Sequence, residues 1–297
     1  MPKILDQPRY KCALGAMQTV HSITKALPIL HSGPGCADKL SGSQGGSGHF
    51  APRIFPCTNL NEKDVIFGGE EGLRDVITNA LKIVNADLYV VLSGCSSEIV
   101  GDDMQEVVRS FKDAEKPVVF ASTAGFKGNN FLGHEWVIQA IIEQYLKPAD
   151  KKAKGLVNIW ASVPQHDPFW YGNLFELENL ITQLGLTPNT IFGYDRGIKN
   201  IDRIPEAEFN LLVSPWVGLS NVKLLEEKFQ TPYLHLPTLP IGAFETSKFL
   251  REVGDFAGID KEKVENIITE SEKNIIILLS DLLMYFWKHE LCQNDLS

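Results

Sequence analysis

Short apolar runs that end in glycine alternate with amphipathic segments along the first half of the chain. The runs KALPILHSG (25–33) and ADLYVVLSG (86–94) have the continuous apolar character of strands that are buried on both faces of a parallel sheet. A third such run, KPVVFASTAG (116–125), precedes a predicted helix around residues 134–146. An apolar stripe at helical spacing predicts another helix over residues 72–86, formed by Leu73, Val76, Ile77, Ala80, Leu81 and Val84. This alternation predicts a doubly wound α/β architecture.

The second half repeats the pattern after a polar stretch at residues 147–155. Strand-like runs and helical segments are expected at 155–164, 169–186, 209–219, 231–242, 247–258 and 261–291. A chain of 297 residues suits about two domains of ordinary size. We therefore predict two Rossmann-like doubly wound domains with mainly parallel sheets, over residues 1–150 and 151–297, the second ending in a long apolar helix.

Charge and the N-terminal sequence narrow the functional classes. The net charge of -9 leaves no basic surface to neutralise phosphate, which argues against a nucleic-acid partner or an anionic membrane. The N-terminus MPKILDQPRYK has no apolar signal-peptide core, so a cytoplasmic, reducing location is expected. In such a compartment the five cysteines favour metal binding over disulfides.

Three cysteines lie in glycine-marked segments: Cys12 in YKCALGA, Cys36 in LHSGPGCADK and Cys95 in VLSGCSSEIVGDD. Soft thiolates select iron–sulfur clusters, zinc or Cu(I). Cys36 and Cys95 each follow a predicted strand, and parallel strands present their carboxyl ends at one edge of the sheet, where ligands bind. Three thiolates are one short of the usual four, so either Cys57 completes the set or the cluster is shared with a second chain.

The order of these motifs resembles the nitrogenase component 1 superfamily. The N-terminal resemblance rests on CALGA, HSGPGC, CTNLNEKDVIFGGEEGL and LSGCSSEIVGDD, and that of the second domain on VPQHDPFWYGNL, SPWVGL and TPYLHLPTLPIGA. The resemblance covers nearly the whole chain. It implies that Cys12, Cys36 and Cys95 match the family's ligands of the P-cluster, an iron–sulfur cluster between two homologous subunits that each give three thiolates.

The resemblance also implies a function and partners. An oxidoreductase subunit with a P-cluster-like or [4Fe-4S] cluster would receive electrons from an ATP-dependent iron protein and work beside a homologous subunit or a second copy of itself. Family members reduce dinitrogen, assemble a metal cofactor on a scaffold pair, or reduce a tetrapyrrole ring. Family subunits usually carry a third domain that is not recognised in this sequence, and part of the iron–molybdenum cofactor site lies there. Substrate reduction at such a cofactor is therefore not expected of this chain alone.

Several alternatives remain open at the level of sequence. A noncatalytic scaffold would hold a cluster or a cofactor precursor, and a structural zinc site could be built from three or four cysteines. His31 either donates to a cluster sulfide or is an ordinary buried histidine at a strand end. The acidic residues Glu98, Asp102 and Asp103 are expected to cap a helix N-terminus. The run at 275–287 is apolar nearly all round its helix and predicts a covering partner.

Overall fold

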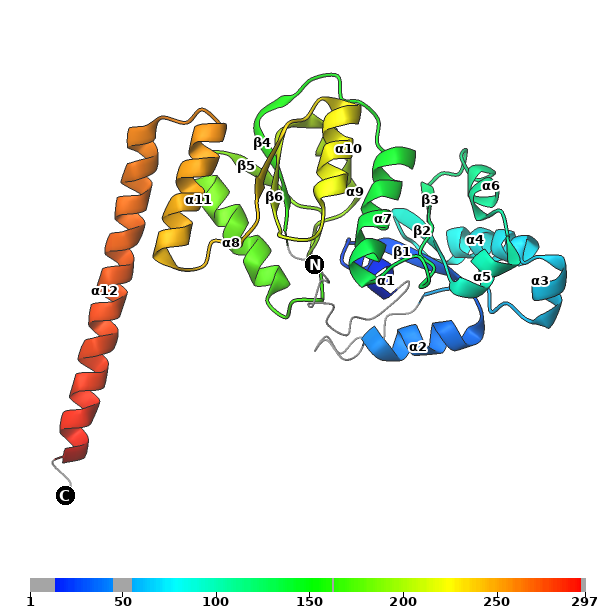
Figure 1. The fold of residues 1–297 in the computed structure, drawn as a ribbon, viewed down its shortest axis with the longest axis horizontal. Helices are drawn as coiled ribbons and strands as arrows, with labels where there is room; N and C mark the ends of the chain where they lie inside the picture. The colour runs from blue at the N-terminus through cyan, green and yellow to red at the C-terminus, as the bar shows by residue number, and fades with distance from the viewer. Residues whose placement is uncertain (1–13, 45–54, 162, 295–297) are drawn as a thin grey trace, which may run out of the picture.

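The computed structural model describes residues 14–44, 55–161 and 163–294, which form two parallel β-sheets connected by helices (Figure 1). The first sheet has the order β1-β2-β3, with the strands Ala26–His31, Leu88–Ser93 and Val118–Ala121. The second has the order β5-β4-β6-β7, with the strands Thr187–Asn189, Ala153–Trp160, Ala207–Val213 and Tyr233–Leu236. The strands of both sheets pair in parallel, so the predicted α/β class is confirmed.

The first sheet is covered by helices on both faces, as a doubly wound sheet requires. The covering helices are α1 (Leu14–His21), α4 (Glu70–Ile83), α6 (Met104–Arg109) and α7 (Asn130–Gln144). Leu27 and Ile29 of β1 join one apolar cluster with α4 and α6, whereas Leu30 joins the opposite cluster with α1 and α7. The alternation of neighbouring side chains between two covered faces explains why the strand sequences are apolar throughout.

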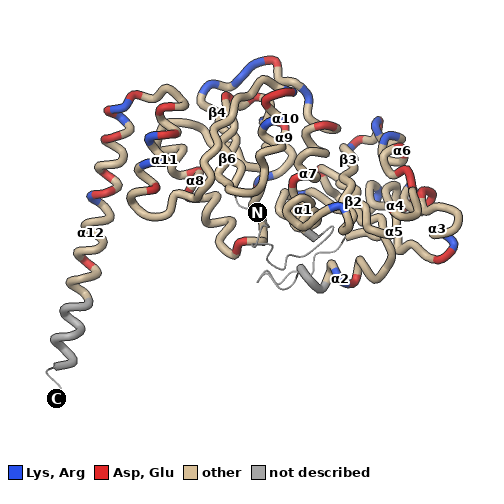
Figure 2. Tube along the Cα trace, in the orientation of Figure 1, with Lys and Arg blue, Asp and Glu red and all other residues tan. Residues whose placement is uncertain are grey.

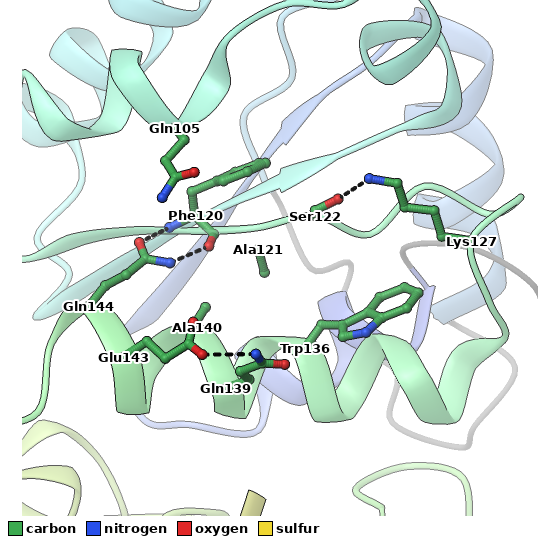
Figure 3. A pocket seen from close by; sticks show the side chains of 10 residues that line it. All are labelled: Gln105, Phe120, Ala121, Ser122, Lys127, Trp136, Gln139, Ala140, Glu143 and Gln144. Atoms are coloured by element: carbon green, nitrogen blue, oxygen red, sulfur yellow. Dashed lines mark hydrogen bonds between the residues drawn. The ribbon is translucent and has the colours of Figure 1, made fainter. Parts of the chain in front are cut away.

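Both edges of the first sheet are occupied. Beyond β1, the segment 56–60 runs alongside the strand, where the Leu30 N–H donates to the Pro56 carbonyl at 2.9 Å and the Thr58 N–H donates to the Leu30 carbonyl at 3.1 Å. Beyond β3, the side-chain amide of Gln144 takes the place of a neighbouring strand. It accepts from the Phe120 N–H at 2.9 Å and donates to the Phe120 carbonyl at 2.7 Å (Figure 3).

A row of asparagines crosses the second sheet. Asn158 of β4 lies in register with Asn189 of β5 and Asn210 of β6, and all three are buried. Asn158 Nδ2 donates to Asn210 Oδ1 at 2.9 Å, and Asn189 Nδ2 donates to Asn158 Oδ1 at 2.8 Å. Trp160 Nε1 also donates to Asn210 Oδ1, at 3.0 Å. The amides therefore satisfy one another across three strands, as buried polar groups must.

Helices also cover the second sheet: α8 (Trp170–Gln183), α10 (Leu219–Phe229) and α11 (Gly242–Phe256), with α9 (Ile198–Asp202) and a 3₁₀ turn, η2 (Ile204–Glu206), between strands. One apolar cluster contains residues of both sheets, because α1 and α7 lie between them. Backbone bonds join the two halves: the Thr24 N–H donates to the Arg196 carbonyl at 2.6 Å, and the Gly193 N–H donates to the Ser22 carbonyl at 2.9 Å. The predicted division at residue 150 stays a prediction, and β4 begins just after it.

The last helix, α12 (Lys261–Asn294), extends away from the rest of the fold (Figure 1). Val264 and Ile268 near its start are buried, and the helix contacts α11. Farther along, the apolar residues between 275 and 285 are exposed, and Asp281 is the single charge among them (Figure 2). The predicted all-round apolar helix is thus present and uncovered in the isolated chain. Among the described residues, no helix has the length and apolar character needed to cross a bilayer.

Candidate functional site

Two predicted cysteines lie at the carboxyl edge of the first sheet. Cys36 belongs to α2 (Pro34–Gln44), which follows β1, and Cys95 is the first residue of α5 (Cys95–Val100), which follows β2. The segments that lead to them touch, because the Gly33 N–H donates to Ser96 Oγ at 3.2 Å. Cys36 is exposed and Cys95 is half-buried. The expectation that both would emerge at one edge of one sheet is therefore met.

Cys57 reaches the same edge through the segment that pairs with β1. Its sulfur accepts from the Asn59 N–H at 3.4 Å and lies 3.5 Å from the Ser32 carbonyl oxygen. Burial raises the pKa of the Cys57 thiol, the two backbone hydrogen bonds oppose this, and a charge on Cys36 raises it further. The sequence left the role of Cys57 open, and its position is compatible with a fourth ligand.

Cys12 lies outside the described residues, two positions before α1 begins. Over the ranges that the structure describes, no three histidine, cysteine or acidic side chains are grouped to hold a metal ion. The ligand set of Cys12, Cys36 and Cys95, with or without Cys57, stays a prediction. The donor chemistry fits it, because Cys36, Cys57 and Cys95 are free thiols on segments that meet at the carboxyl edge of the first sheet.

His31 is held by two partners behind this edge. Its Nε2 lies 2.9 Å from Asp102 Oδ2, and its Nδ1 lies 3.0 Å from Thr58 Oγ1. Burial lowers the pKa of His31, although the neighbouring carboxylate opposes the shift. Both ring nitrogens are engaged, which favours the interpretation of His31 as a satisfied buried histidine over a donor to a cluster sulfide.

The acidic residues after Cys95 have three different roles. Asp103 caps α6, accepting from the Glu106 N–H at 3.0 Å, as the sequence predicted. The same prediction is wrong for Asp102, which binds His31 and accepts from the Gly69 N–H at 2.9 Å. A partner 71 residues away leaves no local pattern, so a capping motif could not reveal this pair.

Glu98 has the third role: it accepts hydrogen bonds from residues before and after Cys95 in the sequence. Its carboxylate accepts from Ser93 Oγ at 2.6 Å, from Ser122 Oγ at 2.5 Å and from Lys127 Nζ at 2.7 Å. Burial raises the pKa of Glu98, but these three donors outweigh it and lower the pKa overall. The Gly125 N–H, in the same loop as Lys127, donates to Cys95 Sγ at 3.2 Å.

A pocket of about 320 Å³ lies beside this loop, between β3, α6 and α7 (Figure 3). Lys127 and Ser122 stand at one end of the pocket and Gln144 at the other, with Trp136 on the α7 side. Sequence reasoning did not identify this pocket, because its lining comes from separate elements.

Glycines in the cysteine segments are required by close packing. A Cβ at Gly94 would meet Ser32 Oγ at 2.1 Å, where the ends of β1 and β2 approach. A Cβ at Gly15 would meet the Asn130 carbonyl oxygen at 1.9 Å, where α1 crosses α7. These glycines therefore hold the cysteine-bearing segments against neighbouring elements, a structural reason distinct from close approach to a cluster.

An exposed apolar surface adjoins the cysteine edge. It consists of Val65, Ile66 and Phe67 of α3 (Glu62–Phe67) and Ile99 of α5, and we call it the α3–α5 patch. Helices α3 and α5 contact each other, so the four residues belong to one end of the first sheet (Figure 1). Phe67 is 79% exposed and Ile99 75% exposed. Neighbouring apolar side chains this exposed mark interaction surfaces on proteins.

Two histidines, the buried His134 and the half-buried His166, lie where the two sheets meet, around α1 and α7. His134 Nδ1 lies 2.8 Å from Thr19 Oγ1, and His166 Nε2 lies 2.7 Å from Gln18 Oε1. Burial lowers the pKa of His134 to about 3, helped by the nearby His166, and burial lowers the pKa of His166 to about 4. Both are therefore neutral at pH 7. The sequence assigned no ligand role to either residue.

Comparison with known proteins places the chain in a family. The family model described as nitrogenase component 1 type oxidoreductase matches residues 12–290. The chain belongs to this family. The resemblance inferred from the cysteine motifs is therefore confirmed, and so is the fold expected from it. A solved structure titled nitrogenase Cp1 at pH 6.5 superposes with a TM-score of 0.77 at 19% identity, covering 92% of this chain and 62% of that one.

The chain is similar to curated proteins that are described by two different functions. A light-independent protochlorophyllide reductase subunit of Gloeothece citriformis is 28% identical over 218 residues, which are 67% of this chain and 41% of the relative. The nitrogenase iron-molybdenum cofactor biosynthesis protein NifE of Methanosarcina barkeri is 27% identical over 280 residues, 89% of this chain and 58% of the relative. The chain thus spans roughly half the length of these relatives.

Proposed function

We propose that this chain is an electron-relaying subunit that binds an iron–sulfur cluster through Cys12, Cys36 and Cys95 and receives electrons from an ATP-dependent iron protein. The observation that carries the proposal is the carboxyl edge of the first sheet. There the segments of Cys36 and Cys95 touch, Cys57 Sγ lies 3.5 Å from the Ser32 carbonyl oxygen, and an exposed apolar surface adjoins them. Family membership supports a metal-sulfur cofactor of this kind.

When bound, a P-cluster-like or [4Fe-4S] cluster supplies reversible one-electron chemistry. The chain's own residues would hold it and control its surroundings. Cys36 and Cys95 lie in the first turns of helices that follow two paired parallel strands, so the sheet anchors both segments. The Gly125 N–H donates to Cys95 Sγ and stabilises negative charge on that sulfur.

The α3–α5 patch is our proposed docking surface for the iron protein. Docking there would bury Phe67 and Ile99, exclude water and bring the donor close to the cysteine edge. Electron transfer needs such closeness, and a patch beside Cys95 provides it.

Metal loading is the first test of the proposal. Anaerobically prepared protein should be brown and contain iron and sulfide, whereas a zinc protein would be colourless. Cys95→Ala should lose iron. Cys292→Ala is the control and should keep it, because Cys292 lies in the polar segment 292–297, outside the cysteine motifs. Cys57→Ala decides between a self-contained site, in which iron is lost, and a site shared with another chain. Equal iron content in the wild type and in Cys95→Ala would contradict the cluster assignment.

Electron uptake is the second test. Phe67→Asp should abolish reduction by the iron protein with MgATP while leaving iron content unchanged. Ile83→Asp is the matched control. Ile83 is 81% exposed, but it is the last residue of α4 and lies toward the amino-terminal ends of the strands, away from the cysteines. Equal rates for the two variants would exclude the patch as the docking surface.

A second candidate is a noncatalytic scaffold that holds a cluster or cofactor precursor. It is favoured by the NifE relative, which matches 89% of this chain. A scaffold would bind iron but would transfer it to an acceptor protein without being reduced by the iron protein. Similarity to a light-independent protochlorophyllide reductase subunit favours a third candidate function, in which the chain passes electrons to a site where a tetrapyrrole ring is reduced. Turnover of such a pigment in the presence of a partner chain would identify it.

The partner is proposed to be a homologous subunit or a second copy of the chain, in a dimer or higher oligomer of the cytoplasm. The cysteine edge and the exposed apolar part of α12 are the surfaces that such a partner would cover. Sedimentation should then show an assembly larger than the monomer. A monodisperse monomer that binds no dye specific for exposed apolar surface would contradict this part of the proposal.

A further inference from the structure

The loop between β3 and α7, residues 122–129, passes beside Cys95 and is fixed at its start. The Thr123 N–H donates to Ser93 Oγ at 2.8 Å, and Thr123 Oγ1 donates to the Ser93 carbonyl at 2.8 Å. Both residues are fully buried. Thr123 is thereby fastened to the end of β2, two residues before Cys95.

Glu98 fastens the other side of the loop. Lys127 Nζ donates to Glu98 Oε2 at 2.7 Å and to Ser122 Oγ at 2.6 Å, the second of which is visible in Figure 3. Ser122 Oγ in turn donates to Glu98 Oε1. Glu98 follows Cys95 by three residues on α5, so the two side chains share one face of that helix.

The fixed ends determine where Gly125 points. A turn closed by the Lys127 N–H donating to the Ala124 carbonyl at 3.0 Å contains Gly125. The Gly125 N–H then donates to Cys95 Sγ at 3.2 Å. Thr123 and Lys127 flank this glycine and are both anchored, which leaves its N–H little freedom to turn away. Hydrogen bonds to cysteine sulfur are among the factors that set the reduction potential of iron–sulfur clusters.

We infer that Glu98 is a positioning residue that acts through Lys127 and Ser122 to hold the Gly125 N–H on the Cys95 sulfur, and so raises the reduction potential of the cluster. The part about potential rests on the proposed function, because it requires Cys95 to be a ligand. The part about positioning does not, because every contact in it lies within this chain.

If Glu98 acted on the sulfur directly through its charge, Glu98→Gln would shift the reduction potential in the opposite direction. Glu98→Gln removes a negative charge, which by charge alone would favour the reduced cluster and raise the potential. If Glu98 acts by positioning, the same change loosens the loop, weakens the N–H···S bond and lowers the potential. Ser122→Ala removes two hydrogen bonds without a change of charge, so under positioning it shifts the potential in the same direction.

The positioning part is tested in protein prepared without iron. Hydrogen exchange at the Gly125 amide should be about tenfold faster in Glu98→Gln and in Ser122→Ala than in the wild type, as expected for loss of one hydrogen bond. Lys116→Met is the matched control. It breaks an ion pair of similar length, Lys116 Nζ to Asp87 Oδ1 at 3.1 Å, at the end of β3 away from the loop. Unchanged exchange in both loop variants would overturn the inference, and Ser122→Ala serves alone if Glu98→Gln does not fold.

The electronic part is tested by a potentiometric titration of the iron-loaded protein. Glu98→Gln and Ser122→Ala should both have a more negative midpoint potential than the wild type, with Lys116→Met unchanged. A more positive or unchanged potential in Glu98→Gln would overturn the inference. If the wild type binds no iron, the proposed function fails while the exchange experiment still decides the positioning of Gly125.

Discussion

The two sheets bury polar side chains of different kinds in different places. In the second sheet they are amides in the middle of the strands, and Asn158, Asn189 and Asn210 satisfy one another. In the first sheet ionisable side chains gather at the strand ends and just beyond them, as in the buried His31–Asp102 pair and the half-buried Glu98. Amides inside a sheet fix its register and do not titrate. Ionisable groups at the carboxyl edge can respond to a ligand or a proton, so ligand chemistry is expected there.

Acid should lower the stability of the protein through His134 and His166, which lie where the two sheets meet. The pKa of His134, about 3, and that of His166, about 4, lie below the ordinary value of 6.5, so the unfolded chain binds more protons as the pH falls below 6.5. The stability they support is present above that pH and is lost as the pH falls toward 4. We expect a loss of about 4 kcal/mol between pH 7 and pH 5. Urea denaturation at several pH values measures it.

A matched variant sharpens this pH dependence. His166→Gln removes one titrating ring while leaving a side chain able to bond to Gln18. It should reduce the slope of unfolding free energy against pH by about half between pH 6 and pH 5. A wild-type stability that is independent of pH in this range would contradict the lowered pKa values of both histidines.

Removal of an amide from the second sheet should have the next largest effect. Asn158→Leu leaves buried groups of Asn189 and Asn210 without their partners, and we expect it to lower the unfolding free energy by about 3 kcal/mol at any pH from 5 to 8. Asn79→Leu, on the exposed face of α4, is the control and should change it little. An equal effect of the two substitutions would mean that the asparagine row does not stabilise the sheet.

The smallest effect is expected at the carboxyl edge of the first sheet. Asp102→Asn keeps the shape of the side chain but weakens its bonds to His31 and Gly69, so we expect a loss of about 2 kcal/mol in unfolding free energy. Asp103→Asn should be nearly neutral, because asparagine caps helices as well as aspartate does. Thermal unfolding of the two variants compares neighbouring residues of identical chemistry. Similar melting temperatures would show that the His31–Asp102 pair contributes nothing.

The fold could be predicted wherever one element carries its own periodic signal. Strands β1, β2 and β3 follow from their apolar runs, and the stripe of α4 from its helical spacing: Leu73, Ile77 and Ala80 are buried as expected. The three-residue strand β5 has no apolar run and was not predicted. Helix α10, which follows the predicted strand at 209–219, was also not identified.

The candidate site could be predicted in part. The shared edge of Cys36 and Cys95 follows from two strand ends, which local patterns reveal. The pairing of Asp102 with His31, and of Lys127 with Glu98, joins residues 71 and 29 positions apart. Such contacts depend on which strands become neighbours, and that is decided by tertiary packing. The uncovered apolar part of α12 was expected from composition, but what covers it depends on another molecule.

The side-chain amide of Gln144 on the rim of β3 affects how these molecules can associate. A bare outer strand is a template on which another chain can add a strand, and such growth leads to aggregation. Here the N–H and carbonyl of Phe120 are already bonded to one primary amide, so an incoming strand would first have to displace it. Strand addition at Phe120 would therefore cost two existing hydrogen bonds, which makes this rim a poorer template than a bare outer strand.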